Sequence, residues 1–204
     1  MWIKREKEIL IRVLILVFLS GCFYGCVHVW PFSSGELKVE EPVSVIPEKA
    51  ECSKPVPYVK PKNEAMMGPA ALAMVMRYYG YDITPEEIAK EIRPEKDKDK
   101  ETHDIMLSDL ALYAKEKGFK TVPCCGTILA IKESIANDTP VIVTVKNTLI
   151  PIFGKERFLV VYGYDDDKGK LYAHGEKPSM AISESSFLRE WKAKNFLFLI
   201  VTPK

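Results

Sequence analysis

Apolar residues of this chain are arranged for helices in the first half of the folded part and for strands in the second. Residues 70–79 are apolar at nearly every position, with Arg77 the main exception, so a helix here should be buried on all sides. Gly68 and Pro69 precede this run and Gly80 follows it. Proline suits a first helical position and glycine suits the position after a helix end. The pattern predicts a central buried helix that opens at Gly68 and Pro69 and ends at Gly80.

The other elements follow from periodicity and from turn residues. Thr84 and Glu87 form a capping box with a proline between them, which predicts a short helix to about residue 92. Further helices are expected at 108–117, 128–136 and 183–191, and strands at 119–123, 141–145, 157–164, 170–173 and 196–201. Because most helices come before an antiparallel series of strands, the sequence predicts an α+β fold.

The N-terminal segment has the pattern of a targeting signal. Four basic residues lie within the first 12, and residues 13–19 are apolar but too few to span a bilayer comfortably. The run ends in Leu-Ser-Gly-Cys at 19–22, which resembles a bacterial lipobox. We therefore expect residues 1–21 to be a lipoprotein signal peptide and Cys22 to be acylated. An uncleaved N-terminal anchor with a chance cysteine is the alternative.

A lipidated Cys22 would place the protein in the cell envelope, anchored to a membrane. Phe23, rather than an aspartate, follows the cysteine and favours the outer membrane, on its periplasmic face. Prolines punctuate residues 22–55 without a clean period, so this stretch is expected to be an extended tether, with the folded domain at 56–204. The net charge of +1 gives no electrostatic case for binding nucleic acid.

Four cysteines remain besides Cys22, in a compartment where disulfides can persist. A bridge between Cys26 and Cys52 is one option that the sequence leaves open. The adjacent Cys124 and Cys125 are expected to be partly buried small hydrophobic residues. Because no cysteine or histidine spacing matches a zinc site, we predict no metal and no cofactor.

Four segments in this order resemble the peptidase C39-like branch of the papain-like cysteine peptidases. Members of that family carry Cys-Gly-Pro-Ala-Ala-Leu-Ala on a central helix, a Pro-Val-Ile-Val strand, a His-Phe-Val-Val-x-Gly-Tyr-Asp strand and a Phe-x-x-x-Trp helix. The matching segments of this chain are MGPAALA at 67–73, PVIV at 140–143, RFLVVYGYD at 157–165 and FLREW at 187–191. The resemblance covers about residues 56–202 and implies a papain-like fold of the C39 type.

The family's catalytic positions are the places where this chain departs from the pattern. Members use a Cys thiolate, a His base, an Asp or Asn that orients the His, and an oxyanion-hole Gln. A thioether has no proton to lose, and a guanidinium cannot accept one at neutral pH. The resemblance therefore implies a peptidase fold without peptidase chemistry. The corresponding positions are Met67 for Cys, Arg157 for His, His174 or Gly175 for the orienting residue, and Lys62 or Pro61 for Gln.

The alternative is a working cysteine peptidase with a rearranged site. Cys124 or Cys125 would then be the nucleophile, because a helix is expected to begin shortly after them. His103 and His174 are the candidate bases. A purely structural lipoprotein is a third hypothesis.

For an inactive domain, we expect the former cleft to bind a carboxylate of a peptide or protein partner in the envelope. The free amides at the start of the central helix, beside Met67 and Gly68, would face an anion. Arg157 would lie opposite with its planar fork, and Lys62 would add a second positive charge. The sequence leaves open that Arg157 instead pairs with a neighbouring acid such as Glu156.

Overall fold

The protein is described here by a computed structural model, which covers residues 51–93, 105–146 and 156–204. The predicted signal peptide, Cys22, Cys26, most of the tether and His103 lie outside these residues. The helices are the 3₁₀ helix η1 (Glu64–Met66), α2 (Met67–Tyr78), α3 (Pro85–Ile92), α4 (Leu107–Glu116), α5 (Ile128–Ala136) and α6 (Glu184–Lys192). The strands are β1 (Glu51–Ser53), β2 (Phe119–Cys125), β3 (Val141–Lys146), β4 (Glu156–Asp165), β5 (Lys170–His174), β6 (Met180–Ser183) and β7 (Leu197–Pro203).

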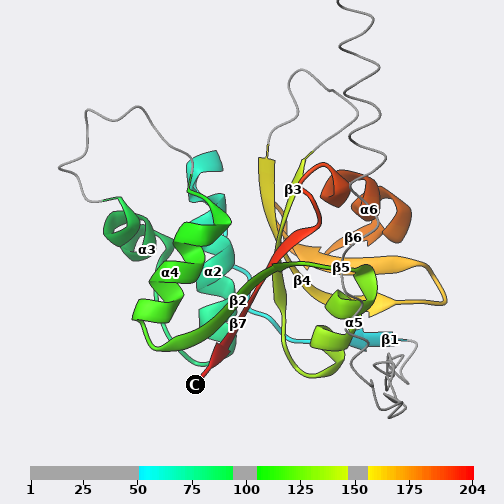
Figure 1. The fold of residues 1–204 in the computed structure, drawn as a ribbon, viewed down its shortest axis with the longest axis horizontal. Helices are drawn as coiled ribbons and strands as arrows, with labels where there is room; N and C mark the ends of the chain where they lie inside the picture. Colours follow the sequence, from blue (N-terminus) through cyan, green and yellow to red (C-terminus); the bar gives the residue numbers. More distant parts are fainter. Residues whose placement is uncertain (1–50, 94–104, 147–155) are drawn as a thin grey trace, which may run out of the picture. The chain divides into compact units, whose positions relative to one another are not determined.

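These strands form one antiparallel sheet in the order β2-β7-β3-β4-β5-β6 (Figure 1). β1 lies beside the second half of β4, with Cys52 opposite Tyr164. A Cβ at Gly163 would lie 2.9 Å from the carbonyl oxygen of Cys52. Only a glycine therefore lets β1 approach β4 so closely.

Local sequence signals explain the ends of the central helices. Asn63 caps η1 by accepting a hydrogen bond from the backbone N–H of Met66 at 3.1 Å. Gly80 follows α2 at φ +81°, a conformation that favours glycine. The capping box at Thr84 and Glu87 is present at the start of α3. These residues form helices at the predicted places because their signals act within one or two turns.

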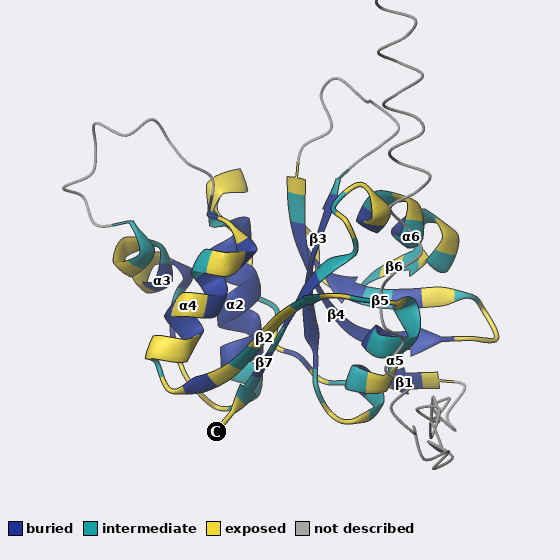
Figure 2. Ribbon diagram, viewed as in Figure 1, coloured by how far each residue is buried: buried dark blue, intermediate teal, exposed yellow. Residues whose placement is uncertain are grey.

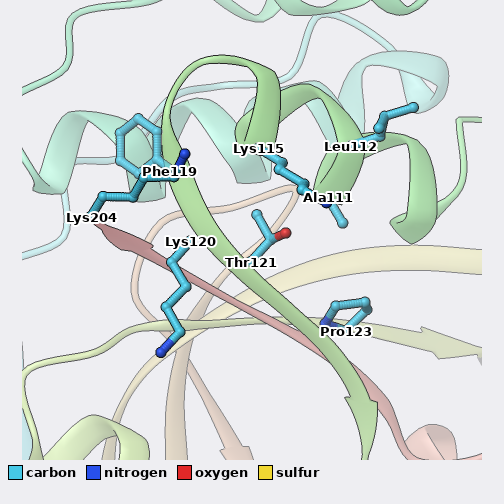
Figure 3. A pocket seen from close by; sticks show the side chains of 8 residues that line it. All are labelled: Ala111, Leu112, Lys115, Phe119, Lys120, Thr121, Pro123 and Lys204. Atoms are coloured by element: carbon cyan, nitrogen blue, oxygen red, sulfur yellow. The ribbon is translucent and has the colours of Figure 1, made fainter.

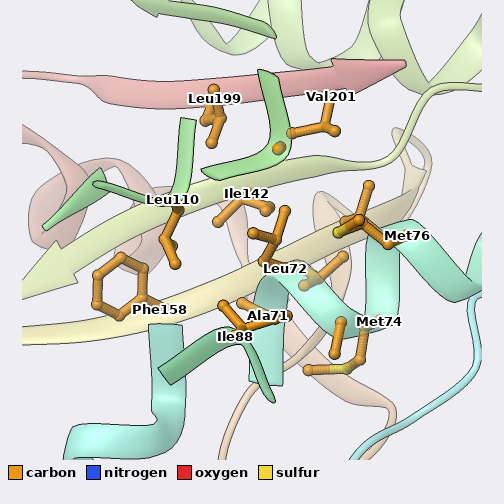
Figure 4. Packing of buried hydrophobic residues seen from close by; sticks show 14 of the residues in the cluster. Ala71, Leu72, Met74, Met76, Ile88, Leu110, Ile142, Phe158, Leu199 and Val201 are labelled. Atoms are coloured by element: carbon orange, nitrogen blue, oxygen red, sulfur yellow. The ribbon is translucent and has the colours of Figure 1, made fainter. Parts of the chain in front are cut away.

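Helices cover both faces of the sheet, and each face has its own core (Figure 2). On one face α2, α3 and α4 pack together, and residues Met67 to Met76 of α2 are all buried. Leu72 and Met76 of α2 meet Ile142 of β3 and Leu199 of β7 in this core (Figure 4). On the other face α5 and α6 pack over a second core that contains Phe187 and Trp191.

β4 contributes to both cores by alternation, and a bulge changes the alternation once. Phe158 and Val160 face α2, whereas Leu159 and Val161 face α5 and α6. The register with β5 shifts between Val161 and Gly163, which leaves Tyr162 as the extra residue. After this bulge, Tyr164 belongs to the α5 and α6 side.

The expected α+β class is confirmed, and each predicted helix and strand is present within a few residues. Two strands were not predicted, β1 and β6, and β2 continues through Cys124 and Cys125. β1 also places residues 51–53 in the sheet, so the folded part begins before the expected boundary at 56. None of the helices in the described ranges combines the length and apolar character that crossing a bilayer requires.

Candidate functional site

The first turn of α2 is closed by side chains from β4 and α4. Met67 is the first residue of α2 and is only 5% exposed. A Cβ at Gly68 would lie 3.3 Å from Cε2 of Phe158 and 3.4 Å from Cδ1 of Leu110. The residue before the helix, Met66, provides no side-chain cap. At the position where the resemblance places a nucleophile, this chain therefore has a buried thioether, and an aromatic ring covers the next residue.

Arg157 does not face Met67, and the predicted arrangement across a cleft is wrong. Its register partner is Val145, which belongs to the core beneath α5 and α6. The Arg157 guanidinium pairs with Glu190 of α6, with 2.5 Å between the Nη2 and Oε2 atoms. Because successive strand residues point to opposite faces, Phe158 occupies the α2 side instead. The ion-pair alternative was correct in kind, although Glu156 itself pairs with Lys194.

His174 lies on the α2 face as part of a packed cluster. Its Nδ1 accepts a hydrogen bond from the backbone N–H of Ser179 at 3.1 Å, and its Nε2 lies 2.9 Å from the carbonyl oxygen of Val56. Since Nδ1 is an acceptor, the proton belongs on Nε2 and is donated to Val56. The rings of Tyr58 and Tyr162 lie 5.4 and 4.4 Å from the imidazole, centroid to centroid.

The surroundings of His174 favour its neutral form. Burial lowers the pKa of His174, and the hydrogen bond to Val56 opposes this shift only in part. Protonation would also remove the acceptor that Ser179 uses. His174 therefore links the segment around Val56 to β5 through a hydrogen bond, and both of its ring nitrogens have partners.

Lys62 points to α3 rather than to the start of α2. Its ammonium lies 2.6 Å from Oε1 of Glu86, and its side chain is 73% exposed. The expected pairing of Lys62 with Arg157 around an anion is therefore wrong. Of the three positive features predicted to converge, only the start of α2 remains, and it is covered by Phe158.

Cys124 and Cys125 form the end of β2, opposite Phe198 and Leu197. Burial raises the pKa of the Cys124 thiol, and the neighbouring Cys125 raises it further. A raised pKa disfavours the thiolate that nucleophilic attack needs. Three strands, β7, β3 and β4, separate these thiols from His174 on β5. Neighbouring strands lie about 4.8 Å apart, so the structure does not bring Cys124 or Cys125 together with His174. A pairing with His103 stays a prediction, because His103 lies outside the described residues.

The three described cysteines, including the buried Cys52, are free of disulfide bonds to one another. A Cys26–Cys52 bridge stays a prediction because Cys26 lies outside the described residues. In the part of the chain that the structure covers, no group of histidine, cysteine or carboxylate side chains is arranged to hold a metal ion.

An open groove lies between α4 and β2, and sequence analysis did not find it. We call it the α4–β2 groove; its volume is about 580 Å³ (Figure 3). Two signals were available in the sequence. Leu112 lies off the apolar stripe of its helix, and Pro123 interrupts a strand. The lining residues are Ala111, Leu112, Lys115, Phe119, Lys120, Thr121, Pro123 and Lys204.

Several solved structures that resemble this fold are described as peptidases or peptidase domains. A chain described as a C39-like peptidase from Bacillus anthracis superposes with a TM-score of 0.62 at 17% identity, covering 76% of this chain and 98% of the other. The peptidase domain of Streptococcus ComA, a bifunctional ABC transporter involved in quorum sensing, gives 0.56 at 21% identity, covering 73% and 99%. A double-glycine-motif protease from an AMS/PCAT transporter, in complex with the leader peptide, gives 0.54 at 20% identity, covering 75% and 94%.

At these identities the structural matches establish the fold alone. A search among curated proteins found no match. The sequence profile of the Peptidase_C39 like family, however, matches residues 53–193, which is more than half of the chain. This chain therefore belongs to the Peptidase_C39 like family.

Proposed function

We propose that this protein is a lipid-anchored protein of the cell envelope whose C39-like domain binds a peptide or protein partner without cleaving it. The observation that carries the proposal is the first turn of α2. Met67 starts that helix, and Phe158 and Leu110 pack over the next residue. A thioether in this position supplies no nucleophile.

Among the described residues, the candidate bases of a cysteine peptidase are also engaged elsewhere. Nucleophilic catalysis needs a thiolate and a base within hydrogen-bond reach of it. Arg157 is held by Glu190 on the other face of the sheet. His174 has both ring nitrogens engaged by the backbone of Val56 and Ser179. Neither side chain is free to remove a proton near Met67.

A binding role is supported by what the fold retains. The domain keeps two packed cores and a complete sheet. On the described surface it offers the α4–β2 groove, which has apolar and basic lining residues. An anchor at Cys22 would hold that groove close to a membrane, on the periplasmic face of the outer membrane, where an envelope partner would meet it.

The test of inactivity is peptide hydrolysis by the full chain in detergent micelles. We expect no turnover of a fluorogenic peptide library above buffer, with or without iodoacetamide. Met67→Cys should be inactive as well, because among the described residues Arg157 and His174 are both engaged elsewhere and cannot act as a base beside residue 67. Turnover that alkylation abolishes, and that is also absent from the Cys124→Ala or the Cys125→Ala variant, would establish the rearranged enzyme instead.

The test of the anchor is independent of the hydrolysis test. Mass spectrometry of the N-terminal peptide should show acyl chains on Cys22. Cys22→Ser should stay unprocessed or leave the membrane fraction, whereas the matched variant Cys26→Ser should behave like wild type. A Cys22→Ser chain that is processed and fractionates like wild type would refute lipidation.

A further inference from the structure

β2 is an edge of the sheet. It pairs with β7 along its whole length, from Phe119 opposite Pro203 to Cys125 opposite Leu197. No other described strand lies beside it. An edge strand presents a row of backbone N–H and C=O groups to whatever approaches.

Two observations establish which backbone groups point outward. Gly126 donates its N–H to the carbonyl of Phe196 at 3.2 Å, so position 126 bonds inward to the β7 side. In an antiparallel ladder, inward and outward positions alternate. Pro123 has no N–H and belongs at an outward position of an edge strand, which agrees with this parity. Phe119, Thr121 and Cys125 therefore direct their N–H groups away from β7.

The side chains at these outward positions lie on the face of the sheet that α4 covers. Thr121 points toward α4, whereas Lys120 extends on the opposite side of β2 (Figure 3). Phe119 is buried, and Tyr81 packs edge-on against its ring at 5.8 Å between centroids. Leu112 on α4 is 58% exposed. An extended segment laid along β2 would thus find apolar contacts on its α4 side.

The lining of the α4–β2 groove carries charge of one sign. Lys115, Lys120 and Lys204 are basic, and no acidic residue lines the groove. These lysines form no ion pair with any residue in the described ranges, whereas Lys117, two residues after Lys115, pairs with Glu91 at 2.8 Å. A partner with carboxylates would supply the missing counter-charges.

We infer that the edge of β2 and the α4–β2 groove together bind an extended acidic segment of a partner polypeptide, which adds as a strand to the sheet. Main-chain hydrogen bonds to the outward groups of Phe119, Thr121 and Cys125 would hold the segment. Carboxylates near Lys115 and Lys120 would select it. The inference rests on the proposed binding function and names the place and the chemistry of the partner.

A second copy of this chain is a poorer occupant of the same edge. Two β2 strands laid together would place lysines of like charge close to one another, which disfavours the pairing. The charges thus point to a different, acidic chain. A concentration-dependent dimer that Lys120→Glu abolishes would show the opposite and would overturn the inference.

The experiment uses the full chain in detergent micelles and a fluorescent ten-residue peptide that alternates valine with glutamate. We expect anisotropy to report saturable binding. The same peptide with lysine in place of glutamate should bind at least about 10-fold more weakly. N-methylation of every second residue should weaken binding by about 10-fold in one of the two registers and leave it unchanged in the other, because only alternate amides face β2.

Protein variants and hydrogen exchange locate the site. Lys115→Glu combined with Lys120→Glu should weaken binding by about 10-fold or more. The matched variant Lys170→Glu with Lys177→Glu, which changes exposed lysines remote from the groove, should leave binding unchanged. Bound peptide should slow exchange of the Phe119, Thr121 and Cys125 amides but not that of amides in β6, the other edge of the sheet.

The outcomes separate this inference from the proposed function. Saturable binding of the acidic peptide that ignores the groove variants and both methylated registers would place the binding surface elsewhere, and only the inference would fail. Absence of binding by acidic, basic and neutral peptides alike would remove the binding role as well. Hydrolysis of the bound peptide would contradict the proposed inactivity but not the inferred binding site.

Discussion

The first turn of α2 and the outer edge of β2 both have backbone N–H groups that neither the helix nor the sheet pairs. The first of these places is covered by side chains, whereas the second is open. At α2, Met67 is buried and Phe158 covers the next residue. At β2, the outward amide of Thr121 lies beside an open, basic groove. Each place also has a proline that removes one N–H, Pro69 in the helix and Pro123 in the strand.

The difference indicates how a domain with a peptidase fold can stay well packed while its open groove lies away from the start of α2. A side chain that packs over the start of α2 stabilises the core but closes the place where the family resemblance puts its nucleophile. The α4–β2 groove adds little to the core, and its lysines remain without acidic partners among the described residues. Under the proposed function, stability and recognition therefore belong to different regions, which the following variants test.

The largest effect on stability should come from removing the side chain that covers the start of α2. Phe158→Ala removes a ring that is 8% exposed and lies against Gly68 and Leu110. We expect a loss of about 3–5 kcal/mol in the free energy of unfolding, measured by urea titration. Leu112→Ala, at an exposed groove position, should change it by less than about 0.5 kcal/mol. Equal costs for the two variants would mean that the two regions do not differ in packing.

A smaller effect should follow from breaking the Arg157 pair. Arg157→Met leaves Glu190 half-buried without its partner. Because the pair is partly exposed, we expect a cost of about 1–2 kcal/mol in unfolding free energy. The variant should bind the acidic peptide like wild type, and Glu190→Gln should cost less than Arg157→Met. Loss of peptide binding in Arg157→Met would return Arg157 to the binding site.

The pH dependence of stability should report the His174 cluster. The pKa of His174 in the folded protein lies below its ordinary value of 6.5 because of burial. Below that value the unfolded chain binds the proton more readily, so stability is full above pH 6.5 and is lost as the pH falls toward the folded-state pKa. Urea titrations at pH 7.5 and 5.5 should show this loss.

His174→Gln is the control for that titration. It removes the titrating group, so the difference in stability between the two pH values should shrink relative to wild type. Carboxylates titrate in both proteins and cancel in the comparison. An unchanged pH dependence in the variant would show that His174 is not the group responsible.

The smallest effect on folding should come from the groove lysines. Lys115→Ala and Lys120→Ala remove exposed charges without acidic partners among the described residues. The unfolding free energy should stay within about 0.5 kcal/mol of wild type, while binding of the acidic peptide weakens and loses part of its salt dependence. A marked loss of stability would show that these lysines support the fold rather than recognition.

Much of the fold could be read from the sequence because its signals are local. The box of Thr84 and Glu87 and the glycine at 80 act within one or two helical turns. The candidate site was predicted less well. The resemblance named Met67, Arg157, His174 and Lys62 as the site positions, but the sequence could not place Arg157 on the correct face of the sheet. A strand pattern that is apolar on both sides carries no preference for either face.

What the sequence determined by itself was the set of elements, the buried central helix and the absence of a thiol at residue 67. Only the tertiary structure decided that Arg157 meets Glu190, that Cys124 and Cys125 belong to an edge strand, and that a groove opens beside them. The physical reason is range. Caps, turns and helical periodicity depend on neighbours in the chain, whereas strand order, the bulge at Tyr162 and the partners of buried charges depend on segments that meet only after folding.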